Sequence, residues 1–268
     1  MRWALAAVLG ILVPPLAWAD SQPSFYEDAS NGCSVGTFHP QPEESVRWTG
    51  PCVGGKAQGR GIAEWSSRGQ FFSRSEGEYR AGLREGRVIS TTADGTRNES
   101  EFRDGKTNGR CIITASDGSR FDGQCADDVY NGTGRAHYAG GDRYYGDFRD
   151  GQKDGHGVYV WKDGSVYDGS FAADKRSGRG KMVSTDRSWY AGEWRDGKTD
   201  GEGVEVFDDG AYYQGHWSDG HPDGFGQYVG IGSRGKPNVW TGQWSQGCFS
   251  SDGMTAAITT TRADCGFE

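Results

Sequence analysis

The sequence predicts an all-β protein in which β-hairpins stack side by side into an elongated antiparallel ribbon with short end caps. The first reason is composition: 45 Gly stand beside 10 Trp, 12 Tyr and 12 Phe, and only 34% of residues are hydrophobic. Such a chain suits tight turns and aromatic packing better than a globular core. The other two reasons are a unit that recurs along the chain and a series of Asp-Gly pairs, which favour hairpin turns.

The clearest copy of the recurring unit runs from Tyr144 to Trp161. It opens with an aromatic residue, a Gly two positions later and a second aromatic residue. A Gly-rich turn, Gly-x-Gly and a short apolar stretch follow. Because side chains alternate between the faces of a strand, Tyr144, Gly146 and Phe148 share one face. Each unit is therefore predicted to be one hairpin with an aromatic face and a polar face.

The N-terminal segment, residues 1–19, has the features of a secretory signal peptide. Arg2 precedes an apolar stretch, and Ala17-Trp18-Ala19 fits a cleavage site, so the mature chain is expected to begin at Asp20. An uncleaved membrane anchor is the alternative. It is less favoured because the apolar stretch is short of about 20 residues and contains Pro14-Pro15. The segment predicts export to the periplasm or the extracellular space.

The remaining chain divides into three predicted parts. Residues 20–47 contain three prolines and no helical periodicity, which indicates a linker and an irregular N-terminal cap. Residues 48–247 form a repeat array, and residues 248–268 form a C-terminal cap. Arrays of this kind are stabilised by contacts between neighbouring repeats and need capped ends.

The array holds about nine copies, and some of them are degenerate. Cys52 takes the second aromatic position of the first copy, and Cys111 replaces the last Gly of the third. From the third copy to the eighth the spacing is constant and equals the interval from Tyr144 to Tyr167. The copies open at Trp48, Ser75, Asn98, Phe121, Tyr144, Tyr167, Tyr190, Tyr213 and Trp240.

The pattern Tyr-x-Gly-x-(Phe/Trp)-x-x-Gly-x-x-x-Gly-x-Gly at this spacing resembles the membrane occupation and recognition nexus (MORN) repeat, over about residues 48–247. Choline-binding cell-wall repeats fit less well, since they have a shorter period and lack Gly-x-Gly. The resemblance implies a structural or interaction module, and some MORN arrays self-associate. The phospholipid binding proposed for the family is not expected here, because the chain is acidic and shows no run of Lys and Arg.

The net charge and the absence of known catalytic motifs disfavour several classes of function. A formal net charge of -8 disfavours nucleic acid and anionic lipid surfaces, because phosphate repels an acidic protein. The sequence contains no nucleophile elbow, phosphate loop or metal-binding motif, so no catalytic residue, cofactor or metal site is predicted. The Asp-rich turns lack calcium-loop spacing and are better explained by turn chemistry.

All six cysteines follow the predicted signal peptide, and an even number in an exported chain favours disulfides. Cys111 and Cys125 flank the Asp117-Gly118 turn almost symmetrically, so the hairpin should bring them together. Pairings of Cys33 with Cys52 and of Cys248 with Cys265 are proposed for the other four, although six cysteines allow other connectivities.

The aromatic ladder is the main candidate site. Its rings could line a groove for a peptide, a partner strand, a lipid head group or a glycan. The favoured interpretation is that most rings pack on one another, since a thin sheet has little other apolar mass to bury. The candidate binding residues are Tyr144, Phe148, Tyr167, Phe171, Tyr190, Trp194, Tyr213, Trp217, Trp240 and Trp244.

The sequence therefore predicts an exported, non-enzymatic scaffold that binds a protein partner, with self-association as a further expectation. The alternative is a module that binds cell-wall or surface carbohydrate through exposed aromatic rings. Function is expected where copies deviate from the pattern, namely in the copies opening at Ser75, Asn98 and Phe121 and at the insertion before Trp240.

Overall fold

The computed structural model describes residues 22–232, 236–251 and 254–266. Within these ranges the chain forms 23 β-strands and no helix, so no helix there could cross a membrane. The predicted all-β class is confirmed. The predicted signal peptide, residues 1–19, and the expected mature start at Asp20 lie outside the described residues.

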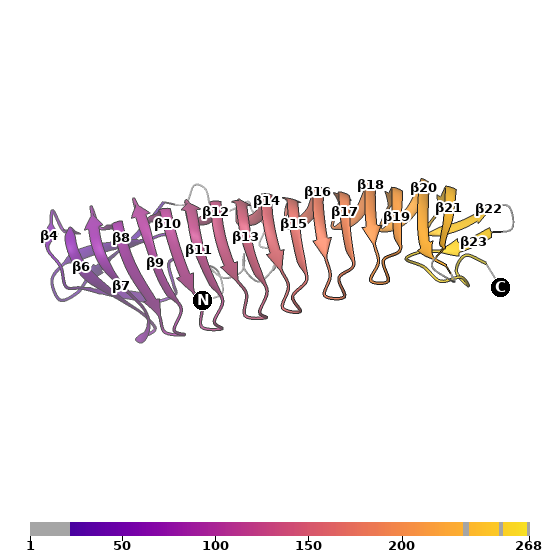
Figure 1. Cartoon of the computed structure of the whole chain (residues 1–268). Coiled ribbons are helices and arrows are strands. Elements are labelled where there is room, and N and C mark those ends of the chain that lie inside the picture. Colours follow the sequence, from indigo (N-terminus) through magenta and orange to yellow (C-terminus); the bar gives the residue numbers. More distant parts are fainter. Residues whose placement is uncertain (1–21, 233–235, 252–253, 267–268) are drawn as a thin grey trace. The chain divides into compact units, whose positions relative to one another are not determined.

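Contacts between residues divide the chain into two units, Met1–Gln152 and Lys153–Glu268, and each is described by itself. Most strands of the first unit, from β6 to β13, are labelled in Figure 1. The strands of this unit are β1 (Ser24–Asp28), β2 (Cys33–Thr37), β3 (Glu44–Trp48), β4 (Cys52–Val53), β5 (Lys56–Ala57), β6 (Gly59–Ser67), β7 (Gln70–Arg80), β8 (Leu83–Thr92), β9 (Arg97–Arg103), β10 (Lys106–Thr114), β11 (Arg120–Ala126), β12 (Val129–His137) and β13 (Arg143–Arg149).

The first unit contains two sheets. The main sheet pairs β3 with β6 and then each strand with the next, from β6 to β13, all antiparallel. The small sheet has the order β1-β2-β5-β4. Three strands therefore occupy about half of residues 20–47, the segment that was expected to be a linker and an irregular cap. The first repeat also departs from the pattern, because Cys52 lies in the small sheet and not beside the other second-position residues.

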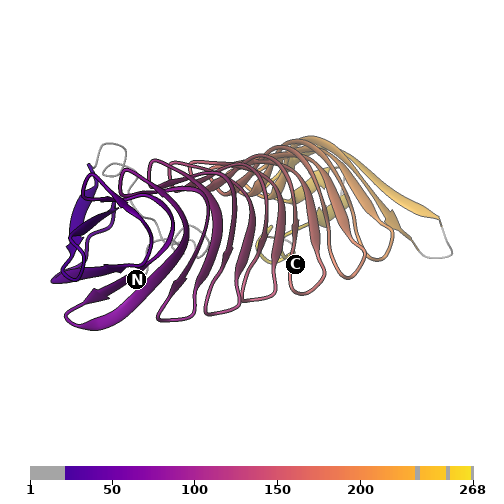
Figure 2. The ribbon, with the colours of Figure 1, turned by 90° about the vertical axis from the view of Figure 1, so that its left-hand side faces the viewer.

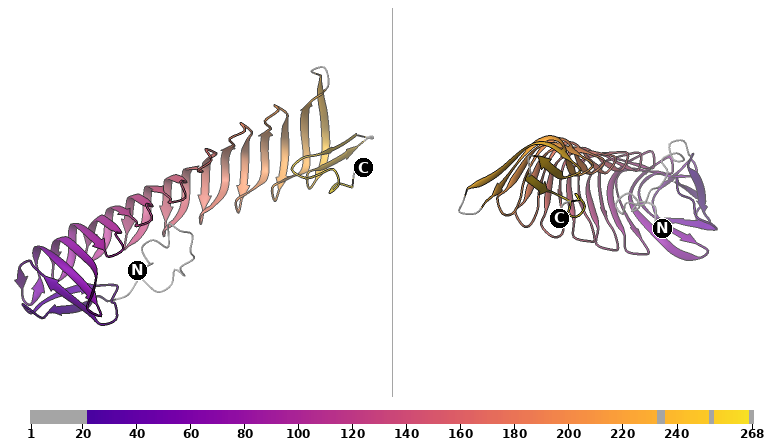
Figure 3. Two further views of the ribbon diagram at one scale, coloured as in Figure 1. Left: turned by 90° about the horizontal axis from the view of Figure 1, so that it is seen from below. Right: turned by 90° about the vertical axis from the view of Figure 1, so that its right-hand side faces the viewer.

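In the second unit every strand from β14 to β23 pairs antiparallel with the next. The β20–β21 hairpin is long and extends past its neighbours (Figure 3). The strands are β14 (Gln152–Val160), β15 (Val166–Ala172), β16 (Lys175–Val183), β17 (Trp189–Arg195), β18 (Lys198–Val206), β19 (Tyr212–Ser218), β20 (His221–Ile231), β21 (Pro237–Ser245), β22 (Cys248–Ser251) and β23 (Met254–Ala257).

Asp-Gly pairs form the turns at both ends of the hairpins, as predicted. At one end two residues connect the strands: Asp104 and Gly105 have φ of 48° and 84°, which is the type I′ geometry that matches strand twist. At the other end the loop is longer, and Asp117 Oδ1 accepts a hydrogen bond from the Ser119 backbone N–H at 2.8 Å. Asp163 does the same for Ser165 at 2.8 Å. These carboxylates stabilise turns, and no cluster of metal-ligand residues occurs in the described ranges.

Most aromatic rings of the first position lie over two glycines, namely those of Trp48, Phe121, Tyr167, Tyr190 and Tyr213. The Tyr190 ring covers Gly192 on its own strand and Gly203 on the next, and a Cβ on either would overlap it. The Tyr190 hydroxyl donates a hydrogen bond to the Glu193 carbonyl at 3.0 Å, which fixes the ring along the strand. The other Gly of Gly-x-Gly, Gly201, has a φ of 104° and lies where the register shifts, so the strand bends there. The bent strands appear as arches in Figure 2.

The small sheet covers the aromatic face at the start of the first unit. Val35 and Cys33 of β2 are buried with the rings of Trp48 and Tyr79. Asp28 links the end of β1 to the end of β3, because its carboxylate accepts hydrogen bonds from the Trp48 N–H at 2.7 Å and from the Ser30 N–H at 2.8 Å. This cap therefore closes the apolar face of the first hairpins.

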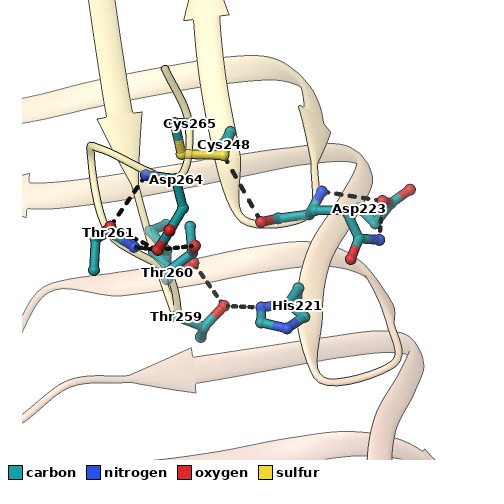
Figure 4. The surroundings of a disulfide bond; sticks show 10 residues. His221, Asp223, Cys248, Thr259, Thr260, Thr261, Asp264 and Cys265 are labelled. Atoms are coloured by element: carbon teal, nitrogen blue, oxygen red, sulfur yellow. Dashed lines mark hydrogen bonds between the residues drawn. A yellow bond between two sulfur atoms is a disulfide. The ribbon is translucent and has the colours of Figure 1, made fainter. Parts of the chain in front are cut away.

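The end of the second unit is closed by β22, β23 and the residues that follow. Phe249 is buried against the Trp244 ring, with 5.1 Å between centroids. Beside the Cys248–Cys265 disulfide, the Asp264 carboxylate accepts hydrogen bonds from the N–H and hydroxyl of Thr261 (Figure 4). The final loop is thus tied to the last strands of the sheet.

All three proposed cysteine pairings are present: Cys33–Cys52, Cys111–Cys125 and Cys248–Cys265, with Cα–Cα distances of 5.8, 5.9 and 5.6 Å. Cys111 lies opposite Gly123, so Cys125 is one same-face step away on the neighbouring strand. The pairing predicted from the position of the turn is confirmed. In the part of the chain that the structure describes, no cysteine is free.

Candidate functional site

The rings proposed from the sequence lie inside the protein. Nine of the ten candidate residues are between 0% and 6% exposed, and Trp240 is half-buried. They pack edge to face along the sheet. The Tyr213 centroid, for example, is 5.3 Å from that of Trp217 and 5.2 Å from that of Trp244. As placed, these rings form the core of the sheet and offer little surface to a ligand.

A second set of side chains covers the ladder beside the bend of each strand. Arg176 stacks on Trp194 with 4.2 Å to the ring centroid, and its guanidinium donates a hydrogen bond to the Gly197 carbonyl. Arg84 stacks on Phe102, also at 4.2 Å. The covering position recurs once in each repeat, at Arg84, Thr107, Tyr130, Lys153, Arg176, Thr199 and Pro222. Cationic side chains on this face therefore take part in the packing of the ladder.

The strand register of the second unit brings together a row that the sequence analysis did not identify. We call the face that carries the buried rings the ring face, and this row on it the aromatic row. One residue from each of eight successive strands lies opposite the next: Tyr159, Tyr167, Met182, Tyr190, Glu205, Tyr213, Tyr228 and Trp240.

Burial alternates along the aromatic row from Tyr159 to Tyr228. Tyr167, Tyr190 and Tyr213 lie flat over glycines and are buried, whereas the other five members are half-buried and reach solvent. Further half-buried rings lie beside the row, since Trp161 is 4.7 Å from Tyr159 and Phe207 is 6.1 Å from Tyr228 between centroids. The ring face of this unit thus presents large apolar side chains to solvent.

The corresponding positions of the first unit carry smaller side chains. The register there aligns Ser75, Ser90, Asn98, Ile113, Phe121, Ala136 and Tyr144. Ser90, Ile113 and Ala136 occupy the places that Met182, Glu205 and Tyr228 take in the second unit. The two units therefore share a packing scheme but differ in the surface that they offer.

Glu205 is the one ionisable carboxyl of the aromatic row. Its Oε2 is buried and has no hydrogen-bond partner within the described residues. Burial raises the pKa of Glu205 to about 7, and no neighbouring charge contributes to the change. Burial also raises the pKa of the flanking phenols, Tyr190 and Tyr213. A buried carboxylate oxygen without a hydrogen-bond partner is unfavourable for folding.

The opposite face of the first unit carries an arginine row that the sequence analysis missed. Arg74, Arg97, Arg120 and Arg143 lie one repeat apart and belong to the cross-strand series Arg74-Thr91-Arg97-Thr114-Arg120-His137-Arg143. The sequence has no run of Lys and Arg, and these single arginines come together only through the strand register. The first three are balanced by carboxylates two residues later: Glu76 at 3.3 Å, Glu99 at 2.9 Å and Asp122 at 3.5 Å.

The opposite face of the second unit carries an apolar series, which we call the valine row. It crosses the same eight strands at Val160, Val166, Val183, Trp189, Val206, Tyr212, Val229 and Val239. All eight are exposed or half-buried. Both faces of this unit thus offer apolar side chains, whereas the first unit offers charged ones on its opposite face.

The geometry defines a class: a β-hairpin repeat protein in which, in most repeats, one ring lies over two glycines. Comparison with protein families identifies the repeat. Six stretches match the family model of the MORN repeat, at residues 76–97, 99–120, 144–166, 167–189, 190–212 and 213–231. The chain therefore contains MORN repeats, which are not a family of enzymes. Residues 121–143 lie outside these stretches, although Phe121 covers Gly123 and Gly134 in the same manner.

Among solved structures, the chain is similar to the SAS-4 (dCPAP) TCP domain of Drosophila melanogaster, solved in complex with a proline-rich motif of Ana2 (dSTIL). The identity is 12%, the TM-score 0.33, and the match covers 57% of this chain and 83% of that one. A streptogramin B lyase is similar with 9% identity and a TM-score of 0.18, covering 86% of this chain and 90% of that chain. No curated protein matches the chain.

Proposed function

We propose that the protein is an exported, non-enzymatic scaffold that binds a protein partner along the aromatic row of its second unit. The observation that carries the proposal is the row itself. Large half-buried side chains lie on the ring face beside rings that are already fixed by packing. They are Tyr159, Met182, Tyr228 and Trp240. MORN repeats commonly serve as scaffolds for protein or membrane interaction, which agrees with such a role.

The dimensions of the row suit an extended polypeptide. Neighbouring strands lie about 4.8 Å apart, so a row across eight strands is about 34 Å long, the length of about ten extended residues. From Tyr159 to Tyr228 the half-buried members come from alternate strands, at intervals of about 10 Å. Aromatic side chains held in place by packing are the usual anchors of protein interfaces, because few of their rotamers are lost on binding.

A selection of peptides tests the proposal. A phage-displayed random peptide library is panned on the immobilised full chain, and recovered peptides are synthesised for affinity measurement. Replacing both Tyr159 and Tyr228 with Ala should weaken binding by tenfold or more. The matched control is Tyr145→Ala, a half-buried tyrosine on the opposite face of the first unit, which should leave binding unchanged. Failure to enrich any peptide, or binding that survives the double substitution, would refute the proposal.

Export is proposed from residues 1–19 and from the three disulfides, which suit an oxidising compartment. N-terminal sequencing of the protein purified from its natural source should begin at Asp20, and thiol titration without reductant should find no free cysteine. A chain that starts at Met1 with reactive thiols would contradict export.

Carbohydrate is the second candidate ligand, favoured by the position of a carboxyl among buried and half-buried rings. Retention on insoluble cell-wall glycans tests it. Substitution of Trp194 or Trp217 would disturb the core, since both are buried. Trp240→Ala is the sharper variant, because Trp240 is half-buried and lies at the end of the row. Retention that the Trp240 variant loses would favour carbohydrate over a peptide; no retention of the parent protein would exclude it.

Self-association is proposed through the valine row. Gel filtration with light scattering should give twice the chain mass, and Val206→Lys should restore the monomer, because a charge in an apolar contact is poorly tolerated. The control is Thr241→Lys, on the same face but outside the valine row. A parent protein that is monomeric at high concentration would dismiss this interface.

A further inference from the structure

We propose that Glu205 anchors a basic side chain, Lys or Arg, of the segment that binds along the aromatic row. The inference rests on the proposed function, since it specifies what the bound segment must carry. It is supported by the position of Glu205 in the row, by its orphaned buried oxygen and by the positions of the protein's own cations.

Glu205 lies near the middle of the aromatic row. The register places Tyr190 of β17 on one side of it and Tyr213 of β19 on the other. One strand further out are Met182 and Tyr228. The titratable groups that face Glu205 from the neighbouring strands are therefore phenols, which stay protonated because burial raises their pKa. A carboxylate among aromatic rings is the arrangement that recognises a cation, by ion pairing and by contact with the rings.

No described basic side chain of the chain itself completes this arrangement. Arg176 stacks on Trp194 and donates to the Gly197 carbonyl. Lys153 pairs with Asp174 at 2.7 Å. Lys181 is on the opposite face, where it stacks on a tryptophan. The cation that Glu205 lacks is therefore one that a partner would bring.

The two tyrosines leave Glu205 available. Their hydroxyls donate to backbone carbonyls three residues on, Tyr190 to Glu193 at 3.0 Å and Tyr213 to His216 at 3.1 Å. Because both phenols donate along their own strands, neither satisfies the carboxyl between them, and Glu205 Oε2 has no hydrogen-bond partner among the residues that the structure describes. The site is thus preorganised for an incoming donor, which limits the loss of conformational freedom on binding.

Binding of a cation should favour the ionised carboxylate, and this gives the inference a pH signature. Glu205 has a pKa of about 7 in the free protein. A ligand that requires the ionised form should bind more weakly as the pH falls, by about tenfold for each pH unit below that pKa. A neutral donor such as a sugar hydroxyl would not show this dependence.

The peptide selection described above supplies the first test. Recovered peptides should carry Lys or Arg at one fixed position between apolar residues. Replacing that residue by norleucine should weaken binding to the full chain at pH 8 by tenfold or more, and should change nothing with Glu205→Gln. Glu202→Gln, on the same strand but the opposite face, is the control and should behave as the parent protein. Peptides that bind the aromatic row without a basic residue would refute the anchor while leaving the docking function standing.

A second measurement needs no peptide. Carbon-13 labelling of glutamate allows the Glu205 carboxyl to be titrated by NMR in the full chain, with Glu205→Gln for assignment. n-Butylammonium, an analogue of the lysine side chain, should lower the pKa of Glu205, whereas n-butanol of the same size should not. Equal effects of the two compounds, or none of n-butylammonium, would overturn the inference.

Discussion

Replacing Glu205 with Gln should make the protein more stable at pH 8. Burial raises the pKa of this carboxyl from 4.5 to about 7. The folded state therefore keeps a proton that the unfolded state loses between pH 4.5 and 7, and the free energy of unfolding falls as the pH rises through that window. The difference between the two pKa values corresponds to about 3 kcal/mol. This penalty is absent below about pH 4.5 and complete above pH 7.

Glutamine keeps the shape of the side chain and removes the charge, so Glu205→Gln should gain about 3 kcal/mol at pH 8 and little at pH 4.5. Urea denaturation followed by tryptophan fluorescence measures the difference at both pH values. Hydrogen exchange of the backbone amides of β17 to β19 shows whether the gain in stability lies in these strands. This measurement is needed because repeat arrays can unfold in parts.

Glu202→Gln is the matched control, because Glu202 lies on the same strand with an exposed side chain beside His216 at 2.9 Å. It should change stability little at either pH. The explanation by burial would be refuted if Glu205→Gln were no more stable than the parent protein at pH 8, or if it gained the same amount at both pH values.

Three further changes test the packing. Gly203→Ala should destabilise by about 3 kcal/mol, since its Cβ would overlap the ring above it, whereas Gly140→Ala has open space and should change the melting temperature little. Asp28→Asn should lower the free energy of unfolding by about 2 kcal/mol above pH 5. Urea denaturation at a series of pH values should also show a smaller loss of stability at acid pH than in the parent protein. Burial opposes ionisation of Asp28, but backbone and hydroxyl donors hold its pKa low, so its contribution disappears as the pH falls through that pKa. Replacing Cys111 and Cys125 with Ser should cost about 3 kcal/mol in thermal unfolding, the value for a loop of this length.

The parts of the fold that follow from short-range patterns could be predicted from the sequence. The alternation of Tyr144, Gly146 and Phe148 identifies one face of a strand, and Asp-Gly marks the turn that brings the next strand alongside. The same turn places Cys111 near Cys125. The expectation that most rings would pack on one another agrees with their burial.

The surfaces could not be predicted in this way, because each is assembled from residues of unlike type that only the register aligns. Tyr159, Met182, Glu205 and Tyr228 occupy the same position of successive repeats, but as a phenol, a thioether, a carboxyl and a phenol they form no repeated motif. The arginine row consists of single residues one repeat apart, so a search for a run of charges misses it. In the N-terminal cap, strands form where prolines suggested irregular structure, since Asp28 holds the segment against β3.

The same geometry explains where specificity can be placed in a repeat of this kind. Tyr167, Tyr190 and Tyr213 each lie over two glycines and donate a hydrogen bond to a backbone carbonyl of their own strand. Their rings therefore serve packing, and the facing position on the next strand is free to vary. In the first unit that position holds Ser90 or Ala136, and in the second it holds Met182 or Glu205. Because the packing of each repeat rests on the glycines and the ring above them, a change at the facing position alters the ligand surface without removing that packing. A carboxyl that destabilises its own strand is therefore better explained by a partner's chemistry than by folding.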